Sequence, residues 1–126
     1  MHIPDDLKYS KDHEWIRLSG SIARVGITDY AQDALGDVVF VQLPESGKKV
    51  SAGQSCSEVE STKSVSDIYV PVSGSITNIN KLLSDSPNLI NTDPYGDGWI
   101  MEIEVSDLTG VAELLDASAY RQFIEG

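Results

Sequence analysis

Apolar and polar residues alternate in many short segments of the chain, and turn residues separate these segments. Near the C-terminus, Met101, Ile103 and Val105 alternate with Glu102 and Glu104, which is the two-residue period of a strand with one face in water. Further strands are predicted at residues 21–27, 38–43, 56–60, 66–70 and 74–80. Many short strands divided by turns predict a mainly β fold of the sandwich or barrel type.

Helices make a smaller contribution to the predicted fold. Asp29 and Gln32 resemble a capping box that begins a short helix, and Gly36 ends it. Two more short helices are predicted at the C-terminal end, and Asp116 is expected to cap the second of them. Residues 82–98 are rich in Ser, Asn, Asp, Pro and Gly, and this composition predicts a long ordered loop.

Residues 58–67 form the most informative segment, because they place one lysine, Lys63, among short polar residues with acidic residues on both sides. The segment joins two predicted strands through a tight turn, and a lysine at such a tip presents its amine for modification. Residues 47–53 and 74–79 each offer a glycine, a turn and a strand, which indicates two similar halves that meet at this hairpin. Lys63 is therefore expected at the apex of a flattened barrel, where it carries a group and performs no chemistry itself.

Length and charge narrow the class of protein. The 126 residues fit one domain, residues 1–126, which is large enough for a hydrophobic core. A formal net charge of −11 disfavours nucleic acid and anionic membrane surfaces as partners, because like charges repel. The longest apolar run, residues 38–41, is far too short to span a membrane. The N-terminal residues resemble neither a secretory signal nor a transit peptide, so the chain is expected to be cytoplasmic or already processed.

The sequence is poorly supplied for catalysis by the chain alone. His2 and His13 do not form a cluster with zinc-ligand spacing, and the single cysteine, Cys56, is predicted to be a small buried residue of a strand. The sequence contains no phosphate-binding or dinucleotide-binding fingerprint. Ser61 and Lys63 indicate a Ser/Lys hydrolase as one alternative, although neighbouring side chains on a strand or turn point apart.

Seven segments, which are spread over nearly the whole chain, match one known family in the same order. They are residues 11–15 (KDHEW), 25–41 (VGITDYAQDALGDVVFV), 43–45 (LPE), 58–63 (EVESTK), 71–74 (PVSG), 93–96 (DPYG) and 98–99 (GW). In these segments the chain resembles the H-protein of the glycine cleavage system. The resemblance implies a lipoyl-carrier fold, which is a barrel-sandwich hybrid with short helices, two of them C-terminal.

By this resemblance, Lys63 receives lipoic acid through an amide bond at its side-chain nitrogen. The family is a carrier and not an enzyme: a pyridoxal-phosphate-dependent glycine decarboxylase loads an aminomethyl group onto the lipoyl arm, and a tetrahydrofolate-dependent aminomethyltransferase unloads it. Dihydrolipoamide dehydrogenase then reoxidises the arm. These three enzymes and a lipoate-attaching enzyme are the implied partners, and we expect a monomer that docks transiently.

The resemblance also implies roles for residues outside the lysine. Glu60, three residues before the lysine, and Gly74, eleven residues after it, match positions that lipoylating enzymes recognise. The alternative for Gly74 is a turn that requires glycine. Glu14 matches a carboxylate that meets the ammonium group of the loaded arm in a cleft; the alternative is a plain carboxylate on the strand face opposite a core Trp15. Ala34 departs from relatives that carry a histidine at its position.

Two alternatives keep the lipoyl group but change its use. The chain is then either a lipoyl domain of another multienzyme complex or an H-like protein that relays lipoyl groups. The sequence disfavours a lipoyl domain of another complex, because such domains usually present Asp-Lys-Ala or Met-Lys-Met at the turn, whereas Lys63 lies in Ser-Thr-Lys-Ser. The expected location is the bacterial cytoplasm, or the mitochondrial matrix for a processed eukaryotic chain.

Overall fold

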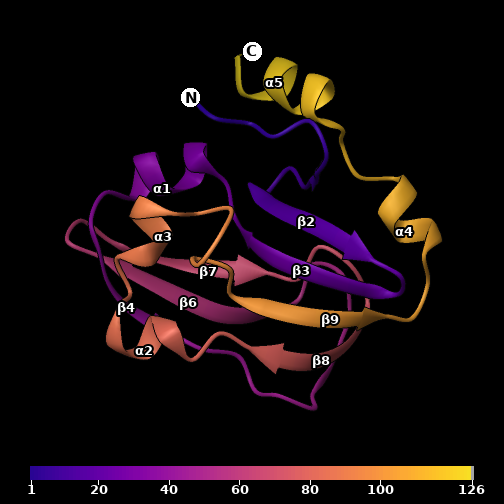
Figure 1. Ribbon diagram of the computed structural model, residues 1–126, viewed down its shortest axis with the longest axis horizontal. Helices are drawn as coiled ribbons and strands as arrows, with labels where there is room; N and C mark the ends of the chain where they lie inside the picture. Colours follow the sequence, from indigo (N-terminus) through magenta and orange to yellow (C-terminus); the bar gives the residue numbers. More distant parts are fainter. Residues whose placement is uncertain (126) are drawn as a thin grey trace.

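The computed structural model describes residues 1–125 and arranges nine strands in two antiparallel sheets with five short helices around them (Figure 1). The strands are β1 (Lys8–Tyr9), β2 (Glu14–Ser19), β3 (Ile22–Ile27), β4 (Val38–Gln42), β5 (Lys49–Val50), β6 (Ser55–Ser61), β7 (Val65–Tyr69), β8 (Gly74–Ile79) and β9 (Met101–Val105). The helices are α1 (Asp29–Leu35), α2 (Leu82–Asp85), α3 (Leu89–Thr92), α4 (Thr109–Ala112) and α5 (Ala117–Glu125). Gly126, the last residue of the predicted domain, lies outside the described residues.

The larger sheet has the strand order β1-β2-β3-β9-β8-β5, and the smaller sheet has the order β4-β6-β7. The chain begins and ends on the same side of the molecule, where α5 lies near the first residues (Figure 1). There the Arg121 guanidinium donates a hydrogen bond to the carbonyl oxygen of Ile3, at 3.0 Å. The architecture confirms the predicted mainly β fold with short helices, two of them C-terminal.

Residues 47–53 and 74–79, the segments predicted to belong to two similar halves, lie side by side. Lys49 pairs with Ser75 and Val50 pairs with Gly74, so β5 joins the edge of the larger sheet next to β8. The pairing brings the two segments together on the sheet that lies opposite the lysine hairpin.

The main core takes apolar side chains from both sheets, as the alternating pattern predicts. In β6, Val59 is buried while Glu58 and Glu60 are exposed, because successive side chains of a strand point to opposite faces. Val59 joins Val41 of β4 and residues of the larger sheet in one buried cluster. The predicted strands are therefore observed with bounds that shift by one residue at most.

Strand β2 was missed by the sequence pattern because both of its faces are covered. Glu14, Trp15 and Ile16 are buried in succession, so no two-residue period appears in the sequence. Ile16 belongs to the main core, whereas Trp15 belongs to a second cluster that packs β1 against α5. Continuous burial of this kind is expected for a strand with packing on both sides.

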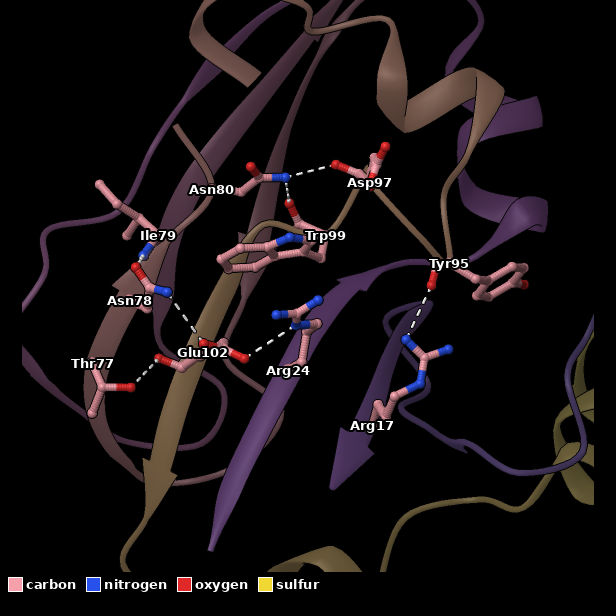
Figure 2. Close-up of polar contacts among 10 residues, drawn as sticks. All are labelled: Arg17, Arg24, Thr77, Asn78, Ile79, Asn80, Tyr95, Asp97, Trp99 and Glu102. Carbon is pink, nitrogen blue, oxygen red and sulfur yellow. Dashed lines mark hydrogen bonds and ion pairs between the residues drawn. The ribbon is translucent and has the colours of Figure 1, made fainter. Parts of the chain in front are cut away.

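The prediction that residues 82–98 form a loop without helices is wrong, because α2 and α3 each add one helical turn there. Each turn inserts one apolar side chain, Leu83 or Ile90, into the main core. The side-chain amide of Asn80 donates hydrogen bonds to the carbonyl oxygens of Asp97 and Trp99, both at 2.7 Å (Figure 2). The segment is thus pinned at its end by Asn80, and polar composition alone does not reveal these anchors.

The termini of two helices differ from the prediction in detail. Thr28, and not Asp29, is the N-cap of α1: its hydroxyl accepts a hydrogen bond from the Ala31 amide at 3.2 Å. Gly36 ends the helix with φ = 83°, as predicted. Asp116 caps α5 as predicted, through a 2.8 Å hydrogen bond from the Ala119 amide. Within residues 1–125, no helix is long and apolar enough to cross a membrane.

On the larger sheet, a charged pair covers part of the aromatic surface. The Arg24 guanidinium lies over the Trp99 ring, 4.4 Å from its centroid, and donates to a Glu102 carboxylate oxygen at 3.1 Å (Figure 2). Arg24 and Glu102 face each other across β3 and β9, so the cross-strand register fixes the pair. Of the two glutamates predicted to lie in water, Glu104 is exposed and Glu102 is half-buried by this contact.

Candidate functional site

Lys63 lies at the exposed tip of the hairpin formed by β6 and β7, as predicted. The two strands pair from Ser55 opposite Tyr69 to Glu60 opposite Val65. Residues 62–64 then connect them. The amine therefore stands clear of both sheets, and nothing in the hairpin itself encloses it.

The hydroxyl of Ser61 organises the tip. This side chain is buried, and its oxygen accepts hydrogen bonds from the amides of Lys63 (3.2 Å) and Ser64 (3.1 Å). The Ser61 amide also donates to the Ser64 carbonyl at 2.8 Å, and the Thr62 amide donates to the Asp37 carbonyl at 3.0 Å. Sequence analysis missed this role, although serine at the start of a turn is a known signal for such bonds.

The C-terminal end of α1 lies directly beneath the lysine side chain. A Cβ atom added at Gly36 would lie 3.0 Å from Cε of Lys63, which is tighter than most such contacts. Gly36 also has φ = 83°, a conformation that other residues rarely adopt. The sequence marked Gly36 only as a helix stop; in the structure it also leaves room for the lysine stem.

A cleft of about 350 Å³ opens beside the tip. Ser64 and Ser66 of the hairpin line one side, and residues of α1 line another. The full lining consists of Asp12, His13, Ile27, Tyr30, Ala31, Ala34, Leu35, Ser64, Ser66, Asp67 and Ile68. Its walls are mainly apolar, and two carboxylates lie among them, so the cleft fits an apolar chain that ends in a cation.

His13 connects this cleft with the C-terminal helix. Its Nδ1 atom is 2.8 Å from the hydroxyl of Tyr120, and the same hydroxyl is 2.8 Å from the Thr28 hydroxyl that caps α1. Burial lowers the pKa of His13, and its backbone has φ = 69°, which is uncommon outside glycine. Helix α5 therefore holds the N-terminal end of the helix that forms a cleft wall. No local pattern in the sequence predicts this long-range contact.

The ring of Tyr120 belongs to a group of packed aromatic side chains that we call the aromatic brace: Tyr9, His13, Trp15, Tyr95 and Tyr120. Tyr9 and Tyr120 stack with centroids 4.7 Å apart. The Trp15 indole donates to the Pro94 carbonyl at 2.9 Å. The brace joins the start of the chain, the start of β2 and α5 into one packed unit.

Glu14 follows His13 but does not line the cleft. Its side chain is only 1% exposed, and the Ser10 hydroxyl donates to its carboxylate at 2.7 Å. Burial raises the pKa of Glu14 to about 7, and the hydrogen bond from Ser10 acts in the opposite direction. The alternative, with Trp15 in the core and Glu14 on the opposite face of β2, agrees with the burial of Trp15, and the structure adds that Glu14 is buried as well.

Glu60 and Gly74, predicted to act together, lie on different sheets. Glu60 is exposed on β6, between Phe40 of β4 and Val65 of β7. Gly74 begins β8, and a Cβ atom there would overlap the carbonyl oxygen of Glu104 on β9. The turn explanation for Gly74 is wrong, because close approach of two strands, and not a left-handed φ, requires the glycine.

Cys56 is a packed strand residue, as predicted. It is partly buried against the main core, with its sulfur 3.7 Å from that of Met101. Burial raises the pKa of the thiol to about 11, which keeps it protonated at neutral pH.

Comparisons with known proteins agree on one family. The model of the glycine cleavage H-protein family matches residues 7–126. A glycine cleavage system H protein of Mycobacterium avium (strain 104) is 59% identical over 124 residues, which cover 94% of each chain. The chain belongs to the glycine cleavage H-protein family. A probable glycine cleavage system H protein of Haloarcula marismortui is 53% identical over 123 residues, which cover 98% of this chain and 97% of that one.

A solved structure shows the same fold. The crystal structure of a glycine cleavage system H protein from Mycobacterium marinum superposes with a TM-score of 0.90 at 49% identity, over 98% of this chain and all of that one. The predicted barrel-sandwich fold is thereby confirmed. H-proteins are carrier subunits of the glycine cleavage system, generally lipoyl carriers, and are not enzymes themselves. Membership in the system implies contacts with its other components.

Proposed function

We propose that this H-protein carries lipoic acid on Nζ of Lys63 and shuttles an aminomethyl group within the glycine cleavage system. The observation that carries the proposal is the exposed lysine at a hairpin tip, beside a cleft with apolar walls. Glycine decarboxylase loads the arm, the aminomethyltransferase unloads it, and dihydrolipoamide dehydrogenase restores its oxidised form. When bound, the lipoyl group supplies a pair of sulfur atoms that the chain's single cysteine does not provide.

The residues around Lys63 fit a long acyl arm. Gly36 leaves space along the lysine stem, and the cleft begins at the neighbouring Ser64. Its apolar walls, Ala31 and Leu35 among them, suit the hydrocarbon part of the arm, since burial removes apolar surface from water. The fixed base with its free arm raises the effective concentration of the cargo at each docked enzyme.

Carboxylates near the cleft favour a cationic cargo. Asp12 and Asp67 line it directly, so they attract an ammonium group at the end of the arm. Glu14 is proposed as a further partner of that ammonium group. Because its side chain is buried and bound to Ser10, Glu14 meets the cargo only when the side chains that line the cleft separate.

Several further properties belong to the same proposal. Glu60 and Gly74 mark the site for the lipoate-attaching enzyme: Glu60 is accessible on the hairpin, and Gly74 maintains the sheet behind it.

Residues 1–126 act as one carrier domain and as a monomer that docks transiently. We place the protein in the bacterial cytoplasm, or in the mitochondrial matrix if the chain has been processed from a eukaryotic precursor.

Intact mass with peptide mapping tests the attachment site. Protein from cells that have lipoate and a competent ligase should gain the mass of one lipoyl group, confined to the peptide that contains Lys63. The variant Lys63→Arg keeps the positive charge and should gain nothing, whereas the exposed control Lys48→Arg should be modified fully. An unmodified wild-type chain under these conditions would rule the proposal out. Exchange of glycine carboxyl with bicarbonate by glycine decarboxylase then separates the aminomethyl shuttle from a lipoyl relay.

A further inference from the structure

Three large apolar side chains are exposed close to the lysine tip. Val39, Phe40 and Val65 expose 52%, 55% and 58% of their surfaces. All three lie on the strands that flank β6, at the end of the smaller sheet that carries Lys63. We call them, together with Glu60, the β6 platform.

The register of the sheet places three of the four platform residues in one row. Phe40 faces Glu60 across β4 and β6, and Glu60 faces Val65 across β6 and β7. Adjacent strands lie about 4.8 Å apart, so an apolar side chain flanks the Glu60 carboxylate on each side. A group that binds this carboxylate must therefore cover Phe40 and Val65 as well.

A β-bulge exposes the two apolar residues that β4 contributes to the platform. The register shifts between Val38 and Phe40, and Val39 is the extra residue. Regular alternation would turn one of two successive residues inward, but the bulge leaves both Val39 and Phe40 in water. Bulges often re-aim side chains beside functional sites. The exposure of this apolar surface is thus built into the backbone.

The charged side chains on the three strands of the platform are all acidic. Glu58 of β6 and Asp67 of β7 pair in an exposed row of the same sheet, next to that of Glu60. The strands β4, β6 and β7 contain no lysine or arginine in their sequences. A complementary surface has an apolar seat with lysine or arginine residues at its rim.

We propose that the β6 platform is the docking surface for the enzyme that acylates Lys63. This inference rests on the proposed function and adds the surface that the enzyme reads. An enzyme that acts on the far end of a long arm can work at a distance from the hairpin. The acylating enzyme has to bring its active site to Nζ itself, so it must lie against the strands next to the tip. The acidic side chains of β6 and β7, and the position of the platform in the register directly beside the lysine hairpin, favour this occupant.

Kinetics of lipoylation with purified components test the proposal. Apo protein is incubated with a lipoate ligase, ATP and lipoate. The lipoate carboxylate attacks the α-phosphate of ATP and displaces pyrophosphate, and the resulting lipoyl adenylate transfers its acyl group to the neutral amine Nζ of Lys63, so an amide forms while AMP and a proton leave. The double variant Phe40→Thr with Val65→Thr removes the apolar surface and keeps residues that favour strands. The matched control is Leu108→Thr, an exposed apolar residue at the N-cap of α4. Helix α4 lies on the opposite side of the molecule from α1 (Figure 1).

The double variant should raise the KM for the apo protein about tenfold or more and leave kcat within about twofold, since exposed contacts act on binding. Its urea midpoint should match that of the wild type, and the control should keep both KM and the midpoint. Salt should raise the wild-type KM, because it screens the acidic rim. An unchanged KM in the double variant would overturn the proposal that the platform is a docking surface. Full modification of the wild-type protein in the same experiment would still support the proposed carrier function. Normal lipoylation with slower glycine decarboxylase exchange would also overturn the docking proposal and assign the platform to that enzyme.

Discussion

The lysine tip and the aromatic brace hold opposite ends of the same helix, α1, by different means. At the tip, Gly36 ends α1 beneath Lys63, and Ser61 secures the turn through hydrogen bonds from backbone amides. At the brace, Tyr120 contacts the N-cap Thr28 and is itself fully buried. At the tip, small polar residues hold the turn and leave the amine accessible. In the brace, packed aromatic rings make the structure rigid. Changes in the brace should therefore reduce stability, and changes at the tip should mainly reduce modification.

The largest expected effect concerns the buried carboxylate beside the brace. The pKa of Glu14 is raised from 4.5 to about 7 by burial, so the folded state holds a proton that the unfolded state has released between these values. Wild-type stability should fall as pH rises through this window, by about 3 kcal/mol in total. Glutamine does not titrate, so Glu14→Gln should lack this pH-dependent loss of stability. Its free energy of unfolding relative to wild type should therefore rise by about 3 kcal/mol between about pH 5 and pH 8.

Urea unfolding at a series of pH values measures this difference. Glu104→Gln, which removes one negative charge from an exposed strand position, is the matched control. A difference between Glu14→Gln and wild type that stays constant across pH would show that the carboxylate is not buried as the structure has it.

A smaller effect is expected when the brace loses one hydroxyl. Tyr120→Phe keeps the stacked ring and removes the atom that lies 2.8 Å from both His13 and Thr28. The free energy of unfolding should fall by about 1–2 kcal/mol, because buried polar partners lose their hydrogen bonds. Tyr69→Phe, on the accessible strand β7, should change stability little. Equal free energies of unfolding for Tyr120→Phe and Tyr69→Phe would show that the Tyr120 hydroxyl does not stabilise the fold.

The smallest effect on stability is expected at the tip. Ser61→Ala removes the oxygen that accepts from the amides of Lys63 and Ser64, at a cost of about 1 kcal/mol or less because water replaces it in part. The rate of lipoylation at limiting protein should fall about threefold, since the loosened turn must be ordered on binding. Ser64→Ala, an exposed neighbour, is the control for both measurements. If Ser61→Ala lost stability without any change in the rate of lipoylation, the tip would serve stability and not modification.

Most strands could be predicted from the sequence because buried and exposed side chains alternate along them. The lysine hairpin could be predicted because its two strands, β6 and β7, follow each other directly in the sequence. The sequence pattern missed β2 because Glu14, Trp15 and Ile16 are all buried, which hides the two-residue period. Its alternative explanation for Gly74 was a turn that requires glycine, although the close backbone of Glu104 is the constraint. Such errors arise where packing on a second face or a partner distant in sequence decides the environment.

By itself, the sequence determined the family resemblance, the mainly β class and the position of Lys63 between two strands, because each depends on residues close together in the chain. Only the tertiary structure decided the rest. The cleft joins residues from the start of β2, α1 and the hairpin, and the brace brings Tyr120 to His13, which lies 107 positions earlier. The proton affinity of Glu14 likewise follows from its burial and not from its neighbours in sequence. Local pattern encodes the elements, but desolvation and long-range contact exist only after those elements have packed.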